Sequence, residues 1–218
     1  LVVWRQIGGE SGIWASHYQV YNELGTWSTP VQISAPGDDA GYPAMATNSA
    51  GTAVVIWQSY DSLADEIHLY SRFYESNSGW GDIIALNTTG CSLARVVLDD
   101  TGAATVGWER CKPRPDDPNS GRVKTAGIHR YIPGTGWTNE VLLEDLDYTD
   151  EYSWAKRPTL ALGPDNTVHA AWVRELNDIY AVRYSLYADS AWSDPETILT
   201  SSDYIYPFAL METNRQGN

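Results

Sequence analysis

The sequence is short of lysine and contains no long apolar run. It has three Lys in 218 residues, and 28 acidic residues against 14 Lys and Arg give a formal net charge of −14. Proteins that bind nucleic acids present a basic surface to the phosphates, so this charge argues against nucleic acids and anionic membrane surfaces as partners. It leaves cationic partners, metal ions and neutral glycans open. No stretch of about 18 apolar residues is present, which argues against a membrane-spanning helix.

The chain also lacks an initiator Met and a signal-peptide pattern, so we expect a processed protein or a fragment. Phenylalanine is scarce, with two residues, whereas Trp and Tyr number ten and fourteen. Tryptophan and tyrosine suit pleated, half-buried strands and binding surfaces with polar edges. A chain of this length buries one sizeable core, and we therefore expect a single domain over residues 1–218.

A short phrase recurs three times along the chain. It reads GTAVVIW at 51–57, GAATVGW at 102–108 and NTVHAAW at 166–172, with a Gly or Asn six positions before each Trp. A Gly or Asn at that place is typical of a three-residue hairpin loop whose last residue adopts a positive φ. Each phrase therefore predicts the second strand of a hairpin, and its apolar residues on both faces predict a sheet covered on both sides.

A second hairpin follows each phrase, with an aromatic-rich strand, a polar turn and a Trp that opens a last strand. Each unit thus supplies four short antiparallel strands in about 50 residues, the pattern of stacked β-propeller blades. A long β-sandwich is the alternative, but it gives no reason for so regular a repeat. We predict an all-β, four-bladed propeller with blades at 1–33 plus 207–218, 43–86, 94–143 and 158–199.

The two ends of the chain each match part of one unit. Residues 207–218 match a first strand and its turn, and LVVW at 1–4 matches the end of a second strand. We therefore expect the C-terminal strand to pair with the N-terminal strand and to close the ring without a free edge. The same ends can instead pair between chains, which would give a homo-oligomer.

The repeat is similar to those of secreted bacterial sialidase-like and lectin-like β-propellers. The shared pattern is P-x-[LM]-A-x-[ND]-x-x-G-x-A-x-[VA]-x-W, followed by an arginine in a later strand, here Arg72, Arg130 and Arg183. The resemblance implies the fold, because propellers support many functions. The S-x-D-x-G-x-x-W box of sialidases and their catalytic residues are not found. We interpret the three arginines as structural residues at equivalent positions.

The two cysteines, Cys91 and Cys111, flank the first hairpin of the third unit. If Asp100-Thr101-Gly102 is a three-residue loop, opposite residues have numbers that sum to 202, and these two cysteines then face each other. We predict a disulfide between them, with buried free thiols as the alternative. A bridge would suit an oxidising compartment, so we expect a secreted or cell-surface protein.

Loops that outgrow their counterparts in other units are the best functional candidates, because the fold does not need them. These are 111–127 and 144–157, on an expected acidic and aromatic face that also includes Asp38 and Asp39. The candidate contact residues are Trp154, Tyr148, Tyr152, Asp116, Asp117, Asp145, Asp147, Asp150, Glu151, Asp61 and Asp65. The segment 145–151 has acids that suit Ca²⁺ but lacks an EF-hand pattern, so we expect no cofactor, with Ca²⁺ as the alternative.

Catalytic signals are weak in the sequence. Adjacent loop acids such as Asp116 and Asp117 usually point apart, and the four His do not form a zinc-spaced cluster. We therefore expect a non-catalytic extracellular binding or scaffold propeller that recognises another protein or a surface filament. The alternative is a glycan-binding lectin, and the third hypothesis is a degenerate sialidase-like glycosidase or lyase.

Overall fold

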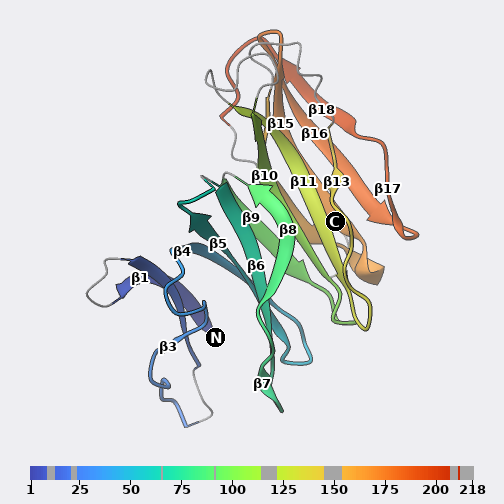
Figure 1. Cartoon of the computed structure of the whole chain (residues 1–218). Coiled ribbons are helices and arrows are strands. Elements are labelled where there is room, and N and C mark those ends of the chain that lie inside the picture. Colours follow the sequence, from blue (N-terminus) through green and yellow to red (C-terminus); the bar gives the residue numbers. More distant parts are fainter. Residues whose placement is uncertain are drawn as a thin grey trace. The chain divides into compact units, whose positions relative to one another are not determined.

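The structure is a computed structural model of the whole chain, and its strands are labelled in Figure 1. It describes residues 1–8, 13–20, 24–64, 66–90, 92–113, 122–144, 154–206 and 211. The chain divides into two compact units, Leu1–Thr89 and Gly90–Asn218, and each is described by itself below.

The first unit contains two antiparallel sheets. The three-stranded sheet has the order β1-β2-β3, and the five-stranded sheet has the order β4-β5-β6-β7 with β8 also paired to β6. The strands are β1 (Val2–Gly8), β2 (Ile13–Gln19), β3 (Val31–Gln32), β4 (Ala40–Thr47), β5 (Ala53–Asp61), β6 (Glu66–Glu75), β7 (Gly79–Trp80) and β8 (Ile84–Gly90).

The second unit contains one ten-stranded sheet made of two five-strand groups. Its main order is β17-β16-β15-β14-β11-β10-β9, and a single parallel bridge between Lys124 and Trp154 joins the two groups. The first group is β9 (Ser92–Leu98), β10 (Ala104–Pro113), β11 (Arg122–Ile132), β12 (Gly136–Trp137) and β13 (Val141–Leu142). The second is β14 (Trp154–Leu162), β15 (Val168–Leu176), β16 (Ile179–Ala188), β17 (Ala191–Trp192) and β18 (Glu196–Ser201), with a 3-10 turn η1 (Pro164–Asn166).

The hairpin turns follow the local sequence as predicted. Gly51, Gly102 and Asn166 have φ values of 79°, 86° and 61°, the left-handed region that Gly and Asn tolerate best. The Asp99 N–H donates to the Ala103 carbonyl at 2.9 Å, so Asp100-Thr101-Gly102 forms the expected three-residue loop. These turn predictions are confirmed.

The strands that end in the repeated Trp form the centres of the sheets. Trp57, Trp108 and Trp172 are all fully buried, and so are Val54, Val55 and Ile56 on the two faces of β5. In the second unit Trp172 belongs to a core cluster with Ile128, which shows that the β9–β11 and β14–β16 groups pack against each other. Burial of each such side chain contributes about 1.5–3 kcal/mol, so the repeat is explained by packing.

Proline interrupts the strand that pairs with a repeated-Trp strand in two hairpins, β4 in the first unit and β14 in the second. The register of β4 against β5 shifts between Gly41 and Ala44, around Pro43, and that of β14 shifts between Lys156 and Thr159. Proline has no N–H for the ladder, so a bulge forms where the chain passes it. The strands therefore start several residues before these prolines, and the bulge changes the direction in which the preceding side chain points.

The described residues form an all-β protein with antiparallel sheets and one 3-10 turn, as the sequence predicts. They contain no closed sheet, so the count of four blades and the closure of the ring are treated as proposals below. No helix in the described part of the chain has the length and apolarity to cross a membrane.

Cys111 on β10 is disulfide-bonded. The register of the surrounding hairpin sums to 202 from Ala104–Leu98 to Gly107–Arg95, as predicted, and then shifts by one residue at Glu109–Ser92. Cys91 is the only other cysteine of the chain and lies outside the described residues, so its pairing stays a prediction.

Candidate functional site

The first unit carries a cleft where β5 ends and β6 begins. Its larger part has a volume of about 490 Å³ and is lined by the 37–39 link, by Ser59–Leu63 and by the His68–Tyr70 part of β6. A smaller hollow of about 250 Å³ adjoins it, since Asp39 and Tyr60 line both. A hydrogen bond of 3.2 Å from the Tyr60 N–H to the Asp39 carbonyl fixes the link against β5.

Two carboxyl groups of the larger cleft have opposite environments. Burial raises the pKa of Asp38 above its ordinary value of 3.8, partly offset by a hydrogen bond with the Ala35 backbone. The pKa of Asp61 is lowered, first by the Leu63 N–H at 2.9 Å and the Ala64 N–H at 3.2 Å, and to a smaller extent by the nearby charge of His68. Hydrogen bonds to a carboxylate favour its ionised form, whereas burial favours the neutral form.

The smaller hollow is lined by an arginine, a tyrosine and an amide. The bulge at Pro43 holds Tyr42 at a φ of 53°, a conformation that is unfavourable for an aromatic residue and is found mainly where surroundings enforce it. Tyr42 is 48% exposed, and the Arg5 guanidinium carbon lies 4.0 Å from its ring centroid. β1 thus supplies a cation to a site otherwise built from Asp39 and from residues of β4, β5 and β6.

Gln58 lies beneath this hollow and is almost fully buried, with 5% exposure. Its Nε2 has no hydrogen-bond partner among the described residues. A buried donor without a partner costs about 1–3 kcal/mol, so this N–H at the wall of a hollow is available to a bound molecule that accepts a hydrogen bond.

Two of the predicted contact residues lie in the described part of the chain. Asp61 lines the cleft, whereas Trp154 begins β14, where the two strand groups of the second unit join. The Trp154 ring has the Lys156 ammonium 3.9 Å above it and the Tyr180 ring 6.2 Å away, so intramolecular packing accounts for it. The other predicted residues lie outside the described residues: Tyr148, Tyr152, Asp116, Asp117, Asp145, Asp147, Asp150, Glu151 and Asp65.

The three arginines of the repeat do not occupy equivalent positions, which corrects that part of the prediction. Their cross-strand partners are Val55, Thr105 and Trp172, at three different distances from the repeated Trp. Arg72 donates to the Gly81 and Ile33 carbonyls. Arg130 bonds Asp99, and Arg183 bonds Glu144, so all three hold turns or links in place.

Sequence reasoning missed Arg5, Tyr42, Gln58 and Tyr60. One available signal is the residue that follows the repeated Trp. In the four sequence repeats this residue is Arg5, Gln58, Glu109 or Val173. A core position should be apolar, and three of these four are polar or charged. Gln58 and Glu109 are nevertheless buried, at 5% and 1% exposure, so a polar residue at this position marks a buried group that needs a polar partner.

Neither a protein-family model nor a curated protein matches this sequence. Solved structures do match it. An ulvan lyase of polysaccharide lyase family PL25, bound to -[GlcA(1-4)Rha3S]-, has a TM-score of 0.55 at 13% identity and covers 86% of this chain and 50% of its own. A second structure of a PL25 ulvan lyase has a TM-score of 0.52 at 12% identity and again covers 86% of this chain and 50% of its own. A Penicillium chrysogenum alpha-L-arabinanase complexed with arabinobiose has a TM-score of 0.48 at 11% identity and covers 91% of this chain and 66% of its own.

At these identities the likeness concerns the fold, which is all-β and of the β-propeller type. This chain spans about half the length of the lyase. The repeat predicts a likeness to sialidases, whereas the structures described above are a lyase and an arabinanase.

The comparisons correct the functional expectation. A non-catalytic scaffold that binds a protein or filament is the wrong reading, and so is the prediction that the chain is not an enzyme, because the solved structures that share its fold are glycan-degrading enzymes. The carbohydrate-directed alternatives fit better. The acidic and aromatic composition of the long loops suits a protein partner and a sugar alike, so composition does not separate protein recognition from sugar recognition.

Proposed function

We propose that this chain is a glycan-degrading protein whose first-unit cleft hydrolyses glycosidic bonds. The main support for this proposal is a pair of carboxyl groups in one cleft, Asp38 with a raised pKa and Asp61 with a lowered pKa. Glycoside hydrolysis generally uses one carboxylic acid and one carboxylate on either side of the scissile bond. Environments that push two pKa values apart assign those two roles.

In this proposal Asp38 donates its proton to the glycosidic oxygen as the bond to the sugar carbon breaks. Asp61 remains ionised and stabilises the positive charge on that carbon, while water supplies the new hydroxyl. The leaving sugar keeps the proton from Asp38, and the proton released by the water restores it. Gln58 donates its free N–H to a sugar hydroxyl, and the exposed faces of Tyr42 and Tyr60 contact the sugar rings.

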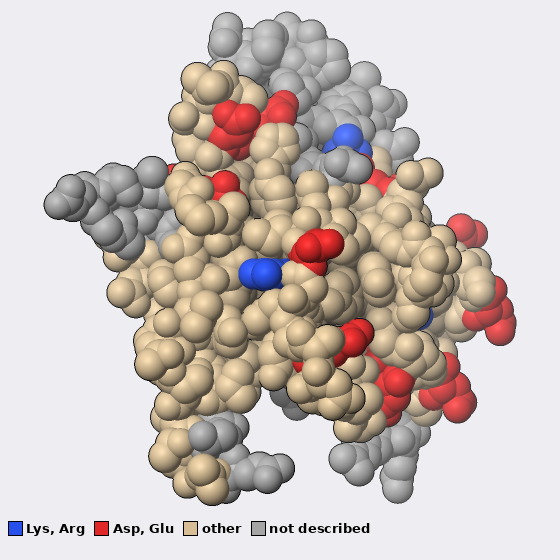
Figure 2. All heavy atoms as spheres, turned by 60° about the horizontal axis from the view of Figure 1, so that its bottom comes forward, with Lys and Arg blue, Asp and Glu red and all other residues tan. Residues whose placement is uncertain are grey.

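The charge of the cleft favours a neutral glycan. Its described lining carries three carboxyl groups, those of Asp38, Asp39 and Asp61, and one guanidinium group, that of Arg5. The drawn face in Figure 2 likewise has scattered acidic side chains and few basic ones. A polymer with a carboxylate or sulfate on every repeat would be repelled by this field.

A second candidate reaction, β-elimination on a uronate-containing glycan, has its own supporting observation. Elimination requires donors that neutralise the sugar carboxylate and a base that removes the adjacent proton. Arg5 and the unpartnered Gln58 amide are such donors, and Tyr60 and His68 line the same cleft. Two ulvan lyase structures are among the solved structures that match this chain with a TM-score above 0.5.

Product analysis separates these reactions. The protein is incubated with neutral glycans (arabinan, galactan, xylan and a β-glucan) and with uronate polymers (pectate, alginate and ulvan). We expect new reducing ends from a neutral glycan and no unsaturated sugar. An unsaturated product from a uronate polymer would replace hydrolysis by elimination, and no product from any glycan would remove the proposed function.

The proposed roles predict an acidic pH optimum. Turnover requires Asp61 ionised, so the rate rises with pH through a pKa that lies below 3.8. It also requires Asp38 protonated, so the rate falls through a pKa that lies above 3.8. We expect a bell-shaped profile of kcat/KM whose descending limb flattens in Asp38→Asn. Circular dichroism at each pH checks that the protein stays folded, and a maximum at alkaline pH would contradict these roles.

Closure into four blades is proposed on the repeat pattern. The C-terminal 207–218 segment would then supply the inner strand of the blade that contains β1, within one chain or from a second copy. The mass of the native assembly decides between these, since a monomer requires closure within the chain.

Secretion is proposed on the disulfide-bonded Cys111 and on the extracellular location of most polysaccharides. Free thiols in protein from its natural source would remove that support.

A further inference from the structure

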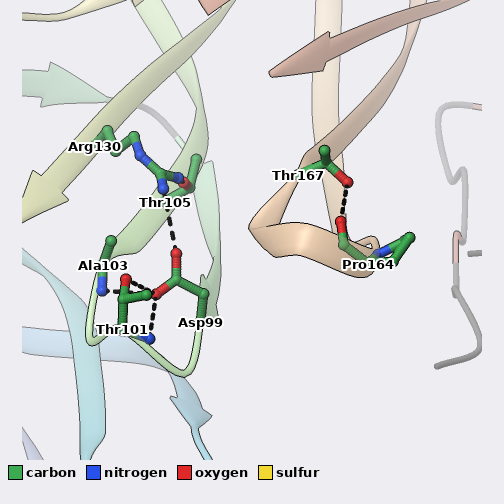
Figure 3. A network of polar contacts seen from close by, with 7 residues as sticks. All are labelled: Asp99, Thr101, Ala103, Thr105, Arg130, Pro164 and Thr167. Carbon is green, nitrogen blue, oxygen red and sulfur yellow. Dashed lines mark hydrogen bonds and ion pairs between the residues drawn. The ribbon is translucent and has the colours of Figure 1, made fainter. Parts of the chain in front are cut away.

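The second unit has a hollow of its own, on the side where its short hairpin turns lie. Its volume is about 490 Å³, within the range of about 300–1,000 Å³ typical of small-molecule sites. Its walls come from the ends of β11 and β16 and from the turns that follow β9, β11, β14 and β16. We call it the turn groove, and the parts of it that Figure 3 draws are the β9–β10 turn with Arg130 and the η1 turn.

The floor of the turn groove is fixed by one polar network. The Arg130 guanidinium donates to Thr105 Oγ1 at 2.8 Å and to Asp99 Oδ2 at 3.2 Å, and its carbon lies 4.4 Å from the Tyr187 ring centroid. Asp99 also accepts the Thr101 and Ala103 N–H groups at 3.0 and 2.9 Å (Figure 3). Among the described residues, Arg130 is the one cation that lines the groove, and it is already paired with a buried carboxylate.

The rim of the groove consists of polar side chains in an unusual backbone conformation. Asp165, Asn166, Asp189 and Ser190 have φ values of 58°, 61°, 51° and 67°. The β9–β10 and β11–β12 turns of this unit place glycines, Gly102, Gly134 and Gly136, at such angles, whereas the β15–β16 turn, which does not line the groove, places Asn177 and Asp178 there. A side chain is unfavourable there relative to glycine, so the two rim turns retain hydrogen-bonding groups at positions where glycine would suit the backbone better.

We infer that the turn groove is a second carbohydrate-binding site, specific for a neutral sugar and separate from the proposed cleft. Pro133, Ile132 and Tyr187 supply apolar surface for the C–H face of a sugar ring. The rim amide, hydroxyl and carboxylates bond sugar hydroxyls. Among the described residues that line the groove, no free cation balances Asp165 and Asp189, so a uronate or sulfated sugar is disfavoured. No group of three or more acidic, His or Cys residues is placed to hold a metal ion in the described part of the chain, which favours sugar over metal.

Glycine substitutions test this site without disturbing the turns. The double variant Asn166→Gly, Ser190→Gly removes two rim side chains and keeps residues that accept a positive φ. Titration of the ¹⁵N-labelled protein with galactose, glucose, arabinose and rhamnose, each alongside glucuronate, is followed by amide chemical shifts. We expect saturable shifts at the rim amides with at least one neutral sugar, and an affinity at least about tenfold weaker in the double variant.

Asn177→Gly is the matched control, because Asn177 has a φ of 53° in the β15–β16 turn and does not line the groove. This variant should bind the neutral sugar as the parent does. Absence of saturable shifts with every sugar, equal affinity in the double variant, or tighter binding of glucuronate would each overturn the inference. The test is independent of the proposed cleft, since Asp38→Asn should leave these shifts unchanged.

Discussion

Asp38→Asn should lower the turnover of a neutral polysaccharide by about 10²–10⁴-fold, the usual contribution of a general acid. An amide of the same shape keeps the contacts of the cleft but cannot deliver a proton to the leaving oxygen. The KM and the unfolding temperature should change little, because Asp38 is only partly buried. The measurement is the steady-state rate of reducing-end release on the glycan that the parent protein cleaves.

A substrate with a good leaving group distinguishes a lost acid from a damaged cleft. An aryl glycoside with a nitrophenolate leaving group needs little protonation, so Asp38→Asn should retain most of its activity on it. Asp82→Asn is the control, because Asp82 is an exposed acid of the same unit that does not line the cleft. Equal losses on both substrates, or full activity on the polysaccharide, would show that Asp38 is not the acid.

Glu144→Ala should destabilise the second unit by about 3–5 kcal/mol, the range for breaking a buried ion pair by removing one partner. The Glu144 side chain is 5% exposed and accepts Arg183 Nε at 2.6 Å, with Arg174 Nη1 at 3.6 Å. Alanine would leave two largely buried guanidinium groups beside each other without their carboxylate. Urea unfolding followed by tryptophan fluorescence measures the change.

The control for this effect is Glu66→Ala, which removes an exposed ion pair. The Glu66 carboxylate lies 3.6 Å from His68, and the two side chains are 48% and 33% exposed. Exposed pairs contribute about 0–1 kcal/mol, so this variant should unfold close to the parent. A loss in Glu144→Ala as small as that of the control would mean that Glu144 does not hold the link between β13 and β14.

The sequence predicted the parts of the fold that depend on neighbouring residues. A Gly or Asn six positions before a Trp specifies the turn, because the left-handed φ is a local requirement, and apolar residues on both faces of β5 specify a covered strand. The last strand of each repeat is divided in two, as in β7 and β8, and the sequence pattern does not predict this division. The Trp that opens the last strand of the repeat marks the first of the two strands, but no local pattern marks the residues that separate it from the second.

The candidate site was largely missed because it depends on contacts between residues far apart in the sequence. Arg5 reaches Tyr42 only because β1 lies near β4, and Tyr42 is exposed only because Pro43 produces a bulge. The pKa values of Asp38 and Asp61 depend on burial and on N–H groups of a folded turn. Trp154 departs from the repeat for a different reason, since it joins two strand groups. A departure from the repeat therefore marks either a ligand site or a structural joint, and the sequence alone does not distinguish them.

Isotope labelling of the product tests the central claim most directly. The protein is incubated with the neutral glycan panel in H₂¹⁸O, and the oligosaccharides are analysed by mass spectrometry. Hydrolysis in the cleft predicts one ¹⁸O at each new reducing end, at an acidic pH optimum, with the label strongly reduced in Asp38→Asn. Unlabelled, unsaturated products, or labelled products formed equally by Asp38→Asn and the parent, would contradict the assignment of this cleft as a glycoside-hydrolysing site.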